Sequence, residues 1–160
     1  MKKKYSYSAY ILCIAIVVFI FTRFCYQLCT VVGDSMLPTC TNGTLLLMQK
    51  YQLADNLQHN DIIVIKHSST QQTLVKRVIG LPGDTITICN GIVYLNDSPY
   101  EEAASFPLIE NAGNAIAPMT LSANQYFVLG DNRNNSIDSR FDEIGIIDFS
   151  QISGKVIYIF

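Results

Sequence analysis

The stretch Thr85–Leu95, with the sequence TITICNGIVYL, decides the fold class. Its two halves are rich in β-branched and aromatic residues, and Asn90-Gly91 lies between them. Both central positions of a tight hairpin turn favour positive φ, which asparagine and glycine tolerate, so this dipeptide predicts a β-hairpin. The chain is therefore expected to contain antiparallel strands.

Short strand-like segments separated by turn formers continue on both sides of this hairpin. The expected strands are Thr44–Met48, Asp61–Lys66, Thr73–Ile79, Asp84–Cys89, Gly91–Leu95, Tyr126–Leu129 and Lys155–Phe160. Pro82-Gly83 marks a further turn, and the proline-containing segment Asn96–Thr120 is expected to be a long loop or small excursion. The predicted fold class is mainly β, with a compact, mostly antiparallel β domain at residues 31–160.

An apolar run precedes the β segments. Tyr5–Thr22 carries no charge, Lys2–Lys4 come before it, and Arg23 follows it. The run is long enough for one membrane-spanning helix, which needs about 18–20 residues. The lysines at its start predict a cytoplasmic N-terminus, with the rest of the chain outside.

A cleaved signal peptide and a buried core helix are the alternatives to a membrane anchor. Phe24–Leu28 offers no small-x-small cleavage site, which argues against the signal peptide. Residues 1–30 are thus expected to form a cytoplasmic N-terminus and a single-pass anchor in the cell membrane, with the lipid bilayer as a partner.

Composition excludes several classes of protein. The 160 residues suffice for one domain, and basic residues do not cluster beyond the N-terminus, so no nucleic-acid partner is expected. The five cysteines include no Cys-x-x-Cys pair, so neither a disulfide framework nor a metal site is expected, and no other cofactor is indicated. Cys40 and Cys89 fall in the β domain; two free thiols are expected, with a disulfide as the alternative.

Three turn-rich polar stretches carry the candidate chemistry: Gly33–Thr39, Lys76–Asp84 and Gly130–Arg140. Ser35 lies in the first, and a serine hydroxyl needs a base to become a nucleophile. His59 and His67 lie outside these stretches with no partnered acid nearby, and both are expected to be ordinary surface histidines. A Ser-His-Asp triad is therefore a poor fit.

Lys76 is the better candidate for the base. Strand alternation places it on one face with Leu74 and Val78, and places Arg77 on the other. Between two apolar neighbours, the amine would lose water, its pKa would fall, and the neutral form would accept a proton. The alternative is a solvent-exposed edge-strand lysine, which sheets use against aggregation.

These three stretches resemble the signature boxes of the type I signal peptidases, the bacterial leader peptidases that use a serine–lysine dyad. The similarity runs in the family's order from the apolar anchor to Gly154–Val156, and Asp61–Val64 resembles a fourth box. The short region between Leu95 and Tyr126 leaves little room for the large extra β domain of longer members, so the chain resembles the minimal, Gram-positive-like form.

The resemblance implies roles for individual residues. Ser35 would be the nucleophile, Lys76 its general base, and Ser136 the group that orients the lysine. The backbone N–H of Ser35 would donate to the oxyanion. Some family members carry a serine at the position of Gly33, and its hydroxyl supplies a second donor. Because this chain has glycine there, the resemblance does not identify which group would be the second donor. The substrate pocket would involve Met36, Leu74 and Val75, and the structural ion pairs would be Arg77 with Asp131 and Asp138 with Arg140.

The implied function is that of a membrane-bound serine endopeptidase that removes N-terminal signal peptides from exported preproteins, which would be its partners. Two alternatives stay open: a non-catalytic relative that assists assembly of surface fibres, and a specialised peptidase for pilus or conjugation subunits. A self-cleaving repressor also uses a serine–lysine pair, but it would be soluble and bind DNA, which the apolar run disfavours.

Overall fold

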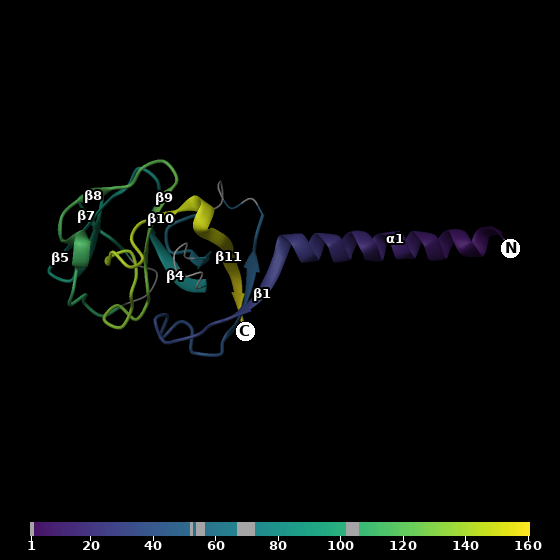
Figure 1. The fold of residues 1–160 in the computed structure, drawn as a ribbon, viewed down its shortest axis with the longest axis horizontal. Coiled ribbons are helices and arrows are strands. Elements are labelled where there is room, and N and C mark those ends of the chain that lie inside the picture. Colours follow the sequence, from purple (N-terminus) through teal and green to yellow (C-terminus); the bar gives the residue numbers. More distant parts are fainter. Residues whose placement is uncertain (1, 52, 54–56, 67–72, 102–105) are drawn as a thin grey trace.

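The computed structural model describes residues 2–51, 53, 57–66, 73–101 and 106–160, with side chains described from Tyr7 onward. A long helix, α1 (Lys2–Cys25), projects from one end of a β domain that contains the other described residues (Figure 1). Among the described helices, only α1 is long and apolar enough to cross a membrane. Its candidate span is Tyr7–Cys25, and none of this segment is buried.

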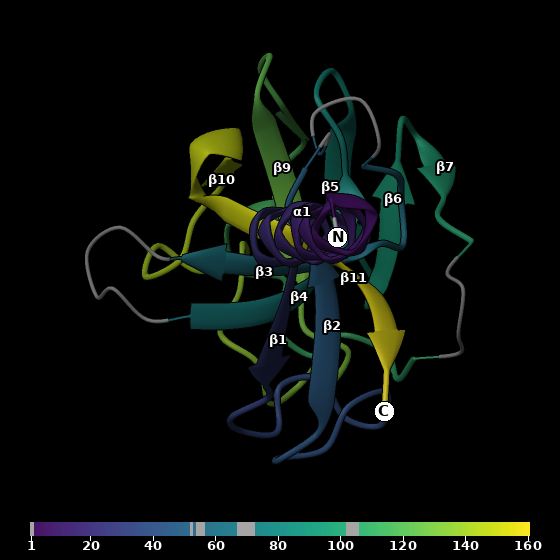
Figure 2. The same cartoon turned by 90° about the vertical axis from the view of Figure 1, so that its right-hand side faces the viewer.

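The larger sheet has seven strands, and all its neighbouring strands are antiparallel. Their spatial order is β1, β2, β11, β3, β4, β9 and β10. Their bounds are β1 Tyr26–Thr30, β2 Leu45–Gln49, β3 Ile62–Lys66, β4 Thr73–Gly80, β9 Gln125–Leu129, β10 Ile147–Asp148 and β11 Ile152–Ile159. Viewed along α1, β1, β2, β3 and β11 lie around the helix axis (Figure 2).

The smaller sheet has four strands in the order β7, β6, β5 and β8. Their bounds are β5 Thr85–Cys89, β6 Ile92–Leu95, β7 Ser98–Pro99 and β8 Met119–Thr120. The hairpin between β5 and β6 turns at Asn90 and Gly91, whose φ values are 50° and 78°, as the sequence predicts. This sheet lies at the end of the domain far from α1 (Figure 1).

All seven predicted strands are present, with ends that shift by up to a few residues. The strands absent from the prediction are β1 and the two-residue strands β7, β8 and β10. Residues 26–30 were grouped with the anchor from sequence, whereas the structure pairs them with β2 as an edge strand of the larger sheet. The predicted excursion at Asn96–Thr120 contains β7, β8 and the short helix η1 (Gly113–Ile116). A second short helix, η2 (Phe149–Gln151), precedes β11.

Three apolar clusters hold the domain together. One fills the face of β3 and β4 that carries Ile63, Ile65 and Val78, and a second joins the two sheets through residues such as Ile79 and Ile86. The third, here called the loop cluster, consists of Val31, Met36, Cys40, Leu46 and Ile62. The loop cluster fixes the segment between β1 and β2 against the larger sheet.

Candidate active site

Ser35 lies in the loop that joins β1 to β2. The Val31 N–H donates to the Thr44 carbonyl and the Cys40 N–H to the Met36 carbonyl, each at 2.9 Å. Met36 and Cys40 are both 1% exposed in the loop cluster, whereas Ser35 remains partly exposed. Buried side chains on both sides thus hold the loop while the serine hydroxyl stays accessible.

Asn132 holds this loop against the segment that follows β9. Its backbone N–H donates to the Ser35 carbonyl at 3.0 Å, and its side-chain Nδ2 donates to the Asp34 carbonyl at 3.1 Å. Nearby Gly130 has no space for a side chain, because a Cβ there would lie 2.5 Å from the Ser35 carbonyl oxygen and collide with Ser136 Oγ. The two segments therefore fit closely together.

Lys76 is in β4, on the face that also carries Leu74 and Val78, as strand alternation predicts. The residue is 2% exposed, and its Nζ donates to Ser136 Oγ at 3.0 Å. Burial lowers the pKa of Lys76 from its ordinary value of 10.5 to about 8, against the opposing effects of Asp138 and Asp131 and with a smaller contribution from Arg140 in the same direction. The alternative of a solvent-exposed lysine is wrong for this structure.

An open cleft of about 760 Å³ brings Ser35, Lys76 and Ser136 to one surface. Apolar side chains supply much of the remaining lining: Val32, Leu74, Ile137, Phe141 and Ile144. A weakly basic amine, two hydroxyls and an apolar wall are the components that acyl transfer at a serine requires.

Two buried ion pairs lie behind the cleft. Arg77 binds Asp131 through two contacts of 2.6 and 2.7 Å, and Arg140 binds Asp138 through two of 2.8 and 3.0 Å. The Asp138 carboxylate also accepts from the Gly130 N–H at 3.0 Å. The structure therefore brings together both pairs that the sequence analysis expected.

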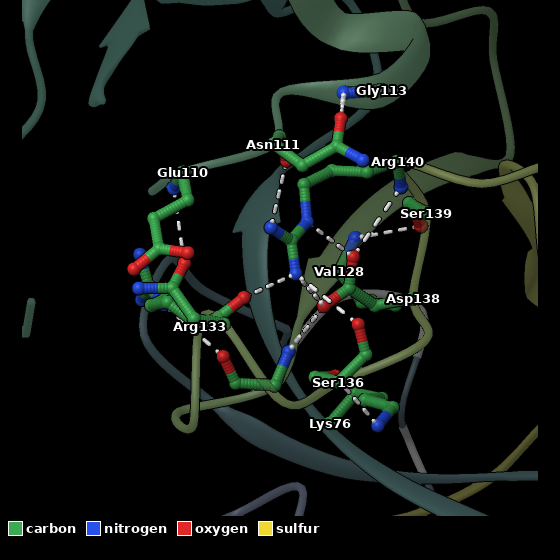
Figure 3. A network of polar contacts seen from close by, with 12 residues as sticks. Lys76, Glu110, Asn111, Gly113, Val128, Arg133, Ser136, Asp138, Ser139 and Arg140 are labelled. Atoms are coloured by element: carbon green, nitrogen blue, oxygen red, sulfur yellow. Dashed lines mark hydrogen bonds and ion pairs between the residues drawn. The ribbon is translucent and has the colours of Figure 1, made fainter. Parts of the chain in front are cut away.

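Arg140 connects its ion pair to the residue that bonds Lys76 (Figure 3). Its Nη2 donates to the Ser136 carbonyl at 3.3 Å and to the Arg133 carbonyl at 2.7 Å. Because both Arg140 and Asp138 are buried, these bonds fix the backbone around Ser136. The Ser136 hydroxyl is thereby held beside the amine.

Sequence reasoning assigned no role to Asn132, Gly130, Arg133, Thr39 or Phe106. Arg133 is 1% exposed, donates to the Gly130 carbonyl at 3.1 Å, and lies 4.3 Å from the centre of the Phe106 ring. The Thr39 hydroxyl donates to Asp131. The first four belong to the polar stretches quoted above, whose many polar residues could have indicated a functional role. Phe106 lies in a loop without periodicity, which gave no such signal.

The predicted substrate-pocket residues separate in the structure. Leu74 lines the cleft, but Met36 and Val75 do not contribute to its described lining and instead belong to or pack against the loop cluster. A role for these two residues in substrate binding stays a prediction. Val75 precedes Lys76 in a strand and so faces the opposite side of the sheet.

Gly33 lines the cleft with φ of 92°, a conformation that favours glycine. Its N–H donates to Asn42 Oδ1 at 3.1 Å. That N–H is thus already used within the loop.

The expectation that His59 has no acid nearby is wrong. His59 Nε2 lies 2.7 Å from Asp84 Oδ2. The antiparallel pairing of β3 with β4 places the turn after β4 next to the segment before β3, so residues 25 apart in sequence meet. Neither residue is among the described lining of the cleft, so the pair does not complete a triad with Ser35. His67 lies outside the described residues.

Among the described residues, all five cysteines are free, with Cys40 buried and Cys89 exposed. The expectation of two free thiols in the β domain is confirmed. The alternative of a Cys40–Cys89 disulfide is not supported.

A family model described as signal peptidase, peptidase S26, matches residues 4–160 of the chain. This chain belongs to the signal peptidase family. Among its relatives, signal peptidase I P from Bacillus subtilis subsp. natto is 34% identical over 155 residues, which cover 90% of this chain and 82% of the relative. Signal peptidase I from Bacillus caldolyticus is 39% identical over 141 residues, covering 78% of this chain and 73% of the relative.

A solved signal peptidase shares the fold. The crystal structure of a signal peptidase I from Enterococcus faecalis V583 matches with a TM-score of 0.50 and 28% sequence identity, covering 64% of this chain and 97% of that one. The mainly β fold of the signal-peptidase type is confirmed, and so is the prediction of a serine peptidase with signal peptidase function. The non-catalytic alternative is not favoured.

Proposed function

We propose that this signal peptidase cleaves the leader from exported preproteins with Ser35 as the nucleophile and Lys76 as the general base. The neutral Lys76 amine accepts the Ser35 hydroxyl proton as Oγ attacks the scissile carbonyl carbon. The resulting ammonium then protonates the departing amine as the peptide bond breaks. Lys76, neutral again, then deprotonates a water molecule, whose oxygen attacks the ester carbonyl of the acyl-enzyme. The bond to Ser35 Oγ breaks, the leader departs with a free carboxylate, and the Lys76 ammonium returns the proton to Oγ.

The observation that carries this proposal is the buried amine of Lys76, bonded to Ser136 and open to the same cleft as Ser35. A pKa of about 8 leaves an appreciable neutral fraction near neutrality, whereas a lysine at 10.5 would be almost wholly charged. His59, the described histidine, bonds Asp84 away from the cleft lining and does not compete for this role.

The chemistry of the cleft supports an extended leader segment as the substrate. The apolar lining of Leu74, Ile137, Phe141 and Ile144 suits uncharged side chains near the cut. Main-chain pairing gives affinity to an extended peptide, and shallow apolar pockets select its side chains. The Ser35 N–H is proposed to stabilise the oxyanion, a contribution that typically changes turnover by about 100- to 1,000-fold.

We place α1 across the cell membrane, with its N-terminus in the cytoplasm and the β domain on the outer side. The length and apolar surface of Tyr7–Cys25 support the span. Lys2–Lys4 precede it, and only Arg23 lies near its other end, which supports the orientation. A tethered domain then meets substrates that are held in the same membrane by their own apolar leaders.

The catalytic assignment is tested with full-length protein in detergent and a leader-bearing preprotein. Ser35→Ala and Lys76→Ala should each abolish cleavage while thermal unfolding stays cooperative. Lys76→Arg should also be inactive, because a guanidinium cannot be deprotonated. Ser122→Ala, which alters an exposed serine in the turn before β9, is the control. Near-normal turnover by Ser35→Ala or Lys76→Ala would refute the dyad.

The orientation is tested through Cys89, which is exposed in the β domain. A membrane-impermeant maleimide applied to intact cells should label the full-length chain, and Cys89→Ser should lose that signal. Labelling of Cys89 only after cell lysis would overturn the proposed orientation.

The range of substrates separates a general enzyme from one dedicated to pilus or conjugation subunits. Mass spectrometry of exported proteins after depletion should find leaders retained on many of them. Retention on only one or two proteins would favour the dedicated peptidase.

A further inference from the structure

A second open hollow lies on the larger sheet, separate from the cleft. It has a volume of about 560 Å³ and is bordered by Lys50 at the end of β2 and Lys66 at the end of β3. Thr30, Thr73 and Ser153 add hydroxyl groups to its lining, and none of the described lining residues is acidic. It is here called the lysine groove.

The charge distribution makes this groove unusual within the domain. After Cys25 the chain contains seven basic and thirteen acidic side chains, so the domain carries a net negative charge. Arg77, Arg140 and Lys155 pair with carboxylates, Lys76 bonds Ser136, and Arg133 donates to a carbonyl. Among the described residues after Cys25, Lys50 and Lys66 are left as the exposed cations without a recorded acidic partner, and both line this groove.

The groove begins where α1 ends. The Lys50 N–H donates to the carbonyl of Cys25, the last residue of α1, at 2.8 Å. Residues of β1, the strand that directly follows α1, also line the groove. In Figure 1, β1 lies at the end of the domain that meets the helix, opposite β5.

Aromatic side chains gather at this junction between α1 and the β domain. The rings of Phe21, Tyr26 and Tyr51 lie 5.8 to 6.4 Å apart, and the two tyrosine hydroxyls are 3.2 Å from each other. Tyrosine is enriched at the membrane–water boundary because its ring is apolar and its hydroxyl is polar. Lys50 adjoins Tyr51 in sequence, so with α1 across the membrane as proposed, the groove would lie near the lipid headgroups.

We propose that the lysine groove binds the phosphate of an anionic phospholipid headgroup. Lys50 and Lys66 donate to the phosphate oxygens, and Thr30 and Thr73 offer hydroxyls to the remainder of the headgroup. This inference rests on the proposed anchoring of the chain through α1, which keeps headgroups beside the groove. Docking here fixes the rotation of an otherwise acidic domain on an anionic membrane surface.

The test is a titration of the full-length chain in detergent, measured by native mass spectrometry. The ligands are dioctanoyl-phosphatidylglycerol, dioctanoyl-phosphatidylcholine and inorganic phosphate. Phosphatidylglycerol should bind more tightly than phosphatidylcholine, because only the former carries net negative charge. Each lysine near a headgroup contributes about fivefold in affinity, so Lys50→Gln with Lys66→Gln should weaken phosphatidylglycerol binding about 30-fold.

Two matched variants separate a site from a general charge effect. Lys155→Gln removes one positive charge from the same domain, but Lys155 is paired with Asp61 at 2.8 Å and is not among the groove lining. The affinity of the Lys155→Gln variant for phosphatidylglycerol should stay within about twofold of the parent. This change is smaller than the effect of about fivefold expected from one groove lysine. The double variant Lys50→Arg with Lys66→Arg should retain binding, because arginine keeps the charge.

Three results would overturn the proposal. One is unchanged phosphatidylglycerol binding by the double glutamine variant. Another is an equal loss in Lys155→Gln, which would indicate a general charge effect. The third is inorganic phosphate competing at the same concentration as the lipid, which would indicate a site for free phosphate.

The outcome can be separated from that of the proposed function. The titration measures binding and not cleavage, so Ser35→Ala should bind phosphatidylglycerol like the parent. Alkaline carbonate extraction of vesicles containing the chain tests the anchor alone. Loss of the chain from the vesicles would refute the anchoring, whereas the detergent titration would still report on the groove.

Discussion

Lys76 Nζ donates a 3.0 Å hydrogen bond to Ser136 Oγ, although the two residues are 60 positions apart in sequence. Ser136 is itself fixed by Arg140, which donates to its carbonyl and is paired with Asp138. In the proposed mechanism, the buried ion pair would act on the reaction through Ser136 and Lys76. This arrangement gives the charged residues behind the cleft a positioning role.

Ser136→Ala should reduce kcat/KM by about 10- to 100-fold, because an unoriented amine spends less time in line with the Ser35 hydroxyl. Stability should change little, since Ser136 is only partly buried. Steady-state cleavage of a leader-bearing peptide measures the effect, with Ser122→Ala as the control. Unaltered kcat/KM would remove Ser136 from the mechanism.

Lys76→Met should make the protein more stable while abolishing turnover. Burial lowers the pKa of Lys76 from 10.5 to about 8, so below pH 8 the folded state carries a desolvated charge. From about pH 8 to about pH 10.5 the unfolded chain binds more protons, and the free energy of unfolding should rise with pH. Methionine removes the charge and should add about 1 to 3 kcal/mol at pH 7.

Denaturant unfolding in detergent at pH 7 and pH 10 measures this effect. The gain in stability of Lys76→Met over the parent should be larger at pH 7 than at pH 10. Lys155→Met, at a lysine that is ion-paired with Asp61, is the control and should show no gain. A Lys76→Met protein less stable than the parent at both pH values would contradict the burial cost.

Gly130→Ala should inactivate the enzyme by about 100-fold or more and destabilise it by about 1 to 3 kcal/mol. The added methyl group would collide with Ser136 Oγ and lie 2.5 Å from the Ser35 carbonyl oxygen, so both segments would have to separate. Cleavage assays and thermal unfolding report the two effects. A fully active Gly130→Ala enzyme would mean that the segments need not pack so closely.

Asp84→Asn should destabilise the fold near neutrality and not in acid. Burial raises the pKa of Asp84, but bonds from His59, the Leu81 N–H and Asn96 outweigh it and hold that pKa below 3.8. The Asp84 carboxylate therefore stabilises the fold above pH 3.8, and this stabilisation is lost as the pH falls through the lower pKa that Asp84 has in the folded state. The expected loss is about 1 kcal/mol at pH 7.

Thermal unfolding of Asp84→Asn from pH 3 to pH 7 checks this dependence. Asp97→Asn removes a carboxylate at an exposed turn, where asparagine suits the positive φ of 64°, and serves as the control. Equal effects of the two substitutions would argue against the His59–Asp84 bond as the cause.

Much of the fold followed from local patterns. Asn90-Gly91 and the alternation in β4 determine a hairpin and the orientation of Lys76 from a few neighbouring residues. The strands β7, β8 and β10 have only two residues each, too few for any periodicity, and form because tertiary pairing brings them to a sheet edge. The strand at residues 26–30 was not predicted, because these residues directly follow the apolar run and were grouped with the anchor.

The site was predicted less completely. Resemblance and alternation together pointed to Ser35 and Lys76, and the structure brings both to one cleft. The His59–Asp84 contact depends on how β3 and β4 pair, and the Arg133–Phe106 contact on the path of an aperiodic loop. Such contacts between distant segments leave no local pattern in the sequence.

The pH dependence of kcat/KM for the full-length enzyme tests the role of the Lys76 amine most directly. Because the neutral amine is the base, kcat/KM should rise with pH, reach half its maximum near the Lys76 pKa of about 8, and level off above it. A profile that is flat from pH 6 to pH 10, or one still rising tenfold per pH unit at pH 10, would contradict a buried, readily deprotonated Lys76 as the general base.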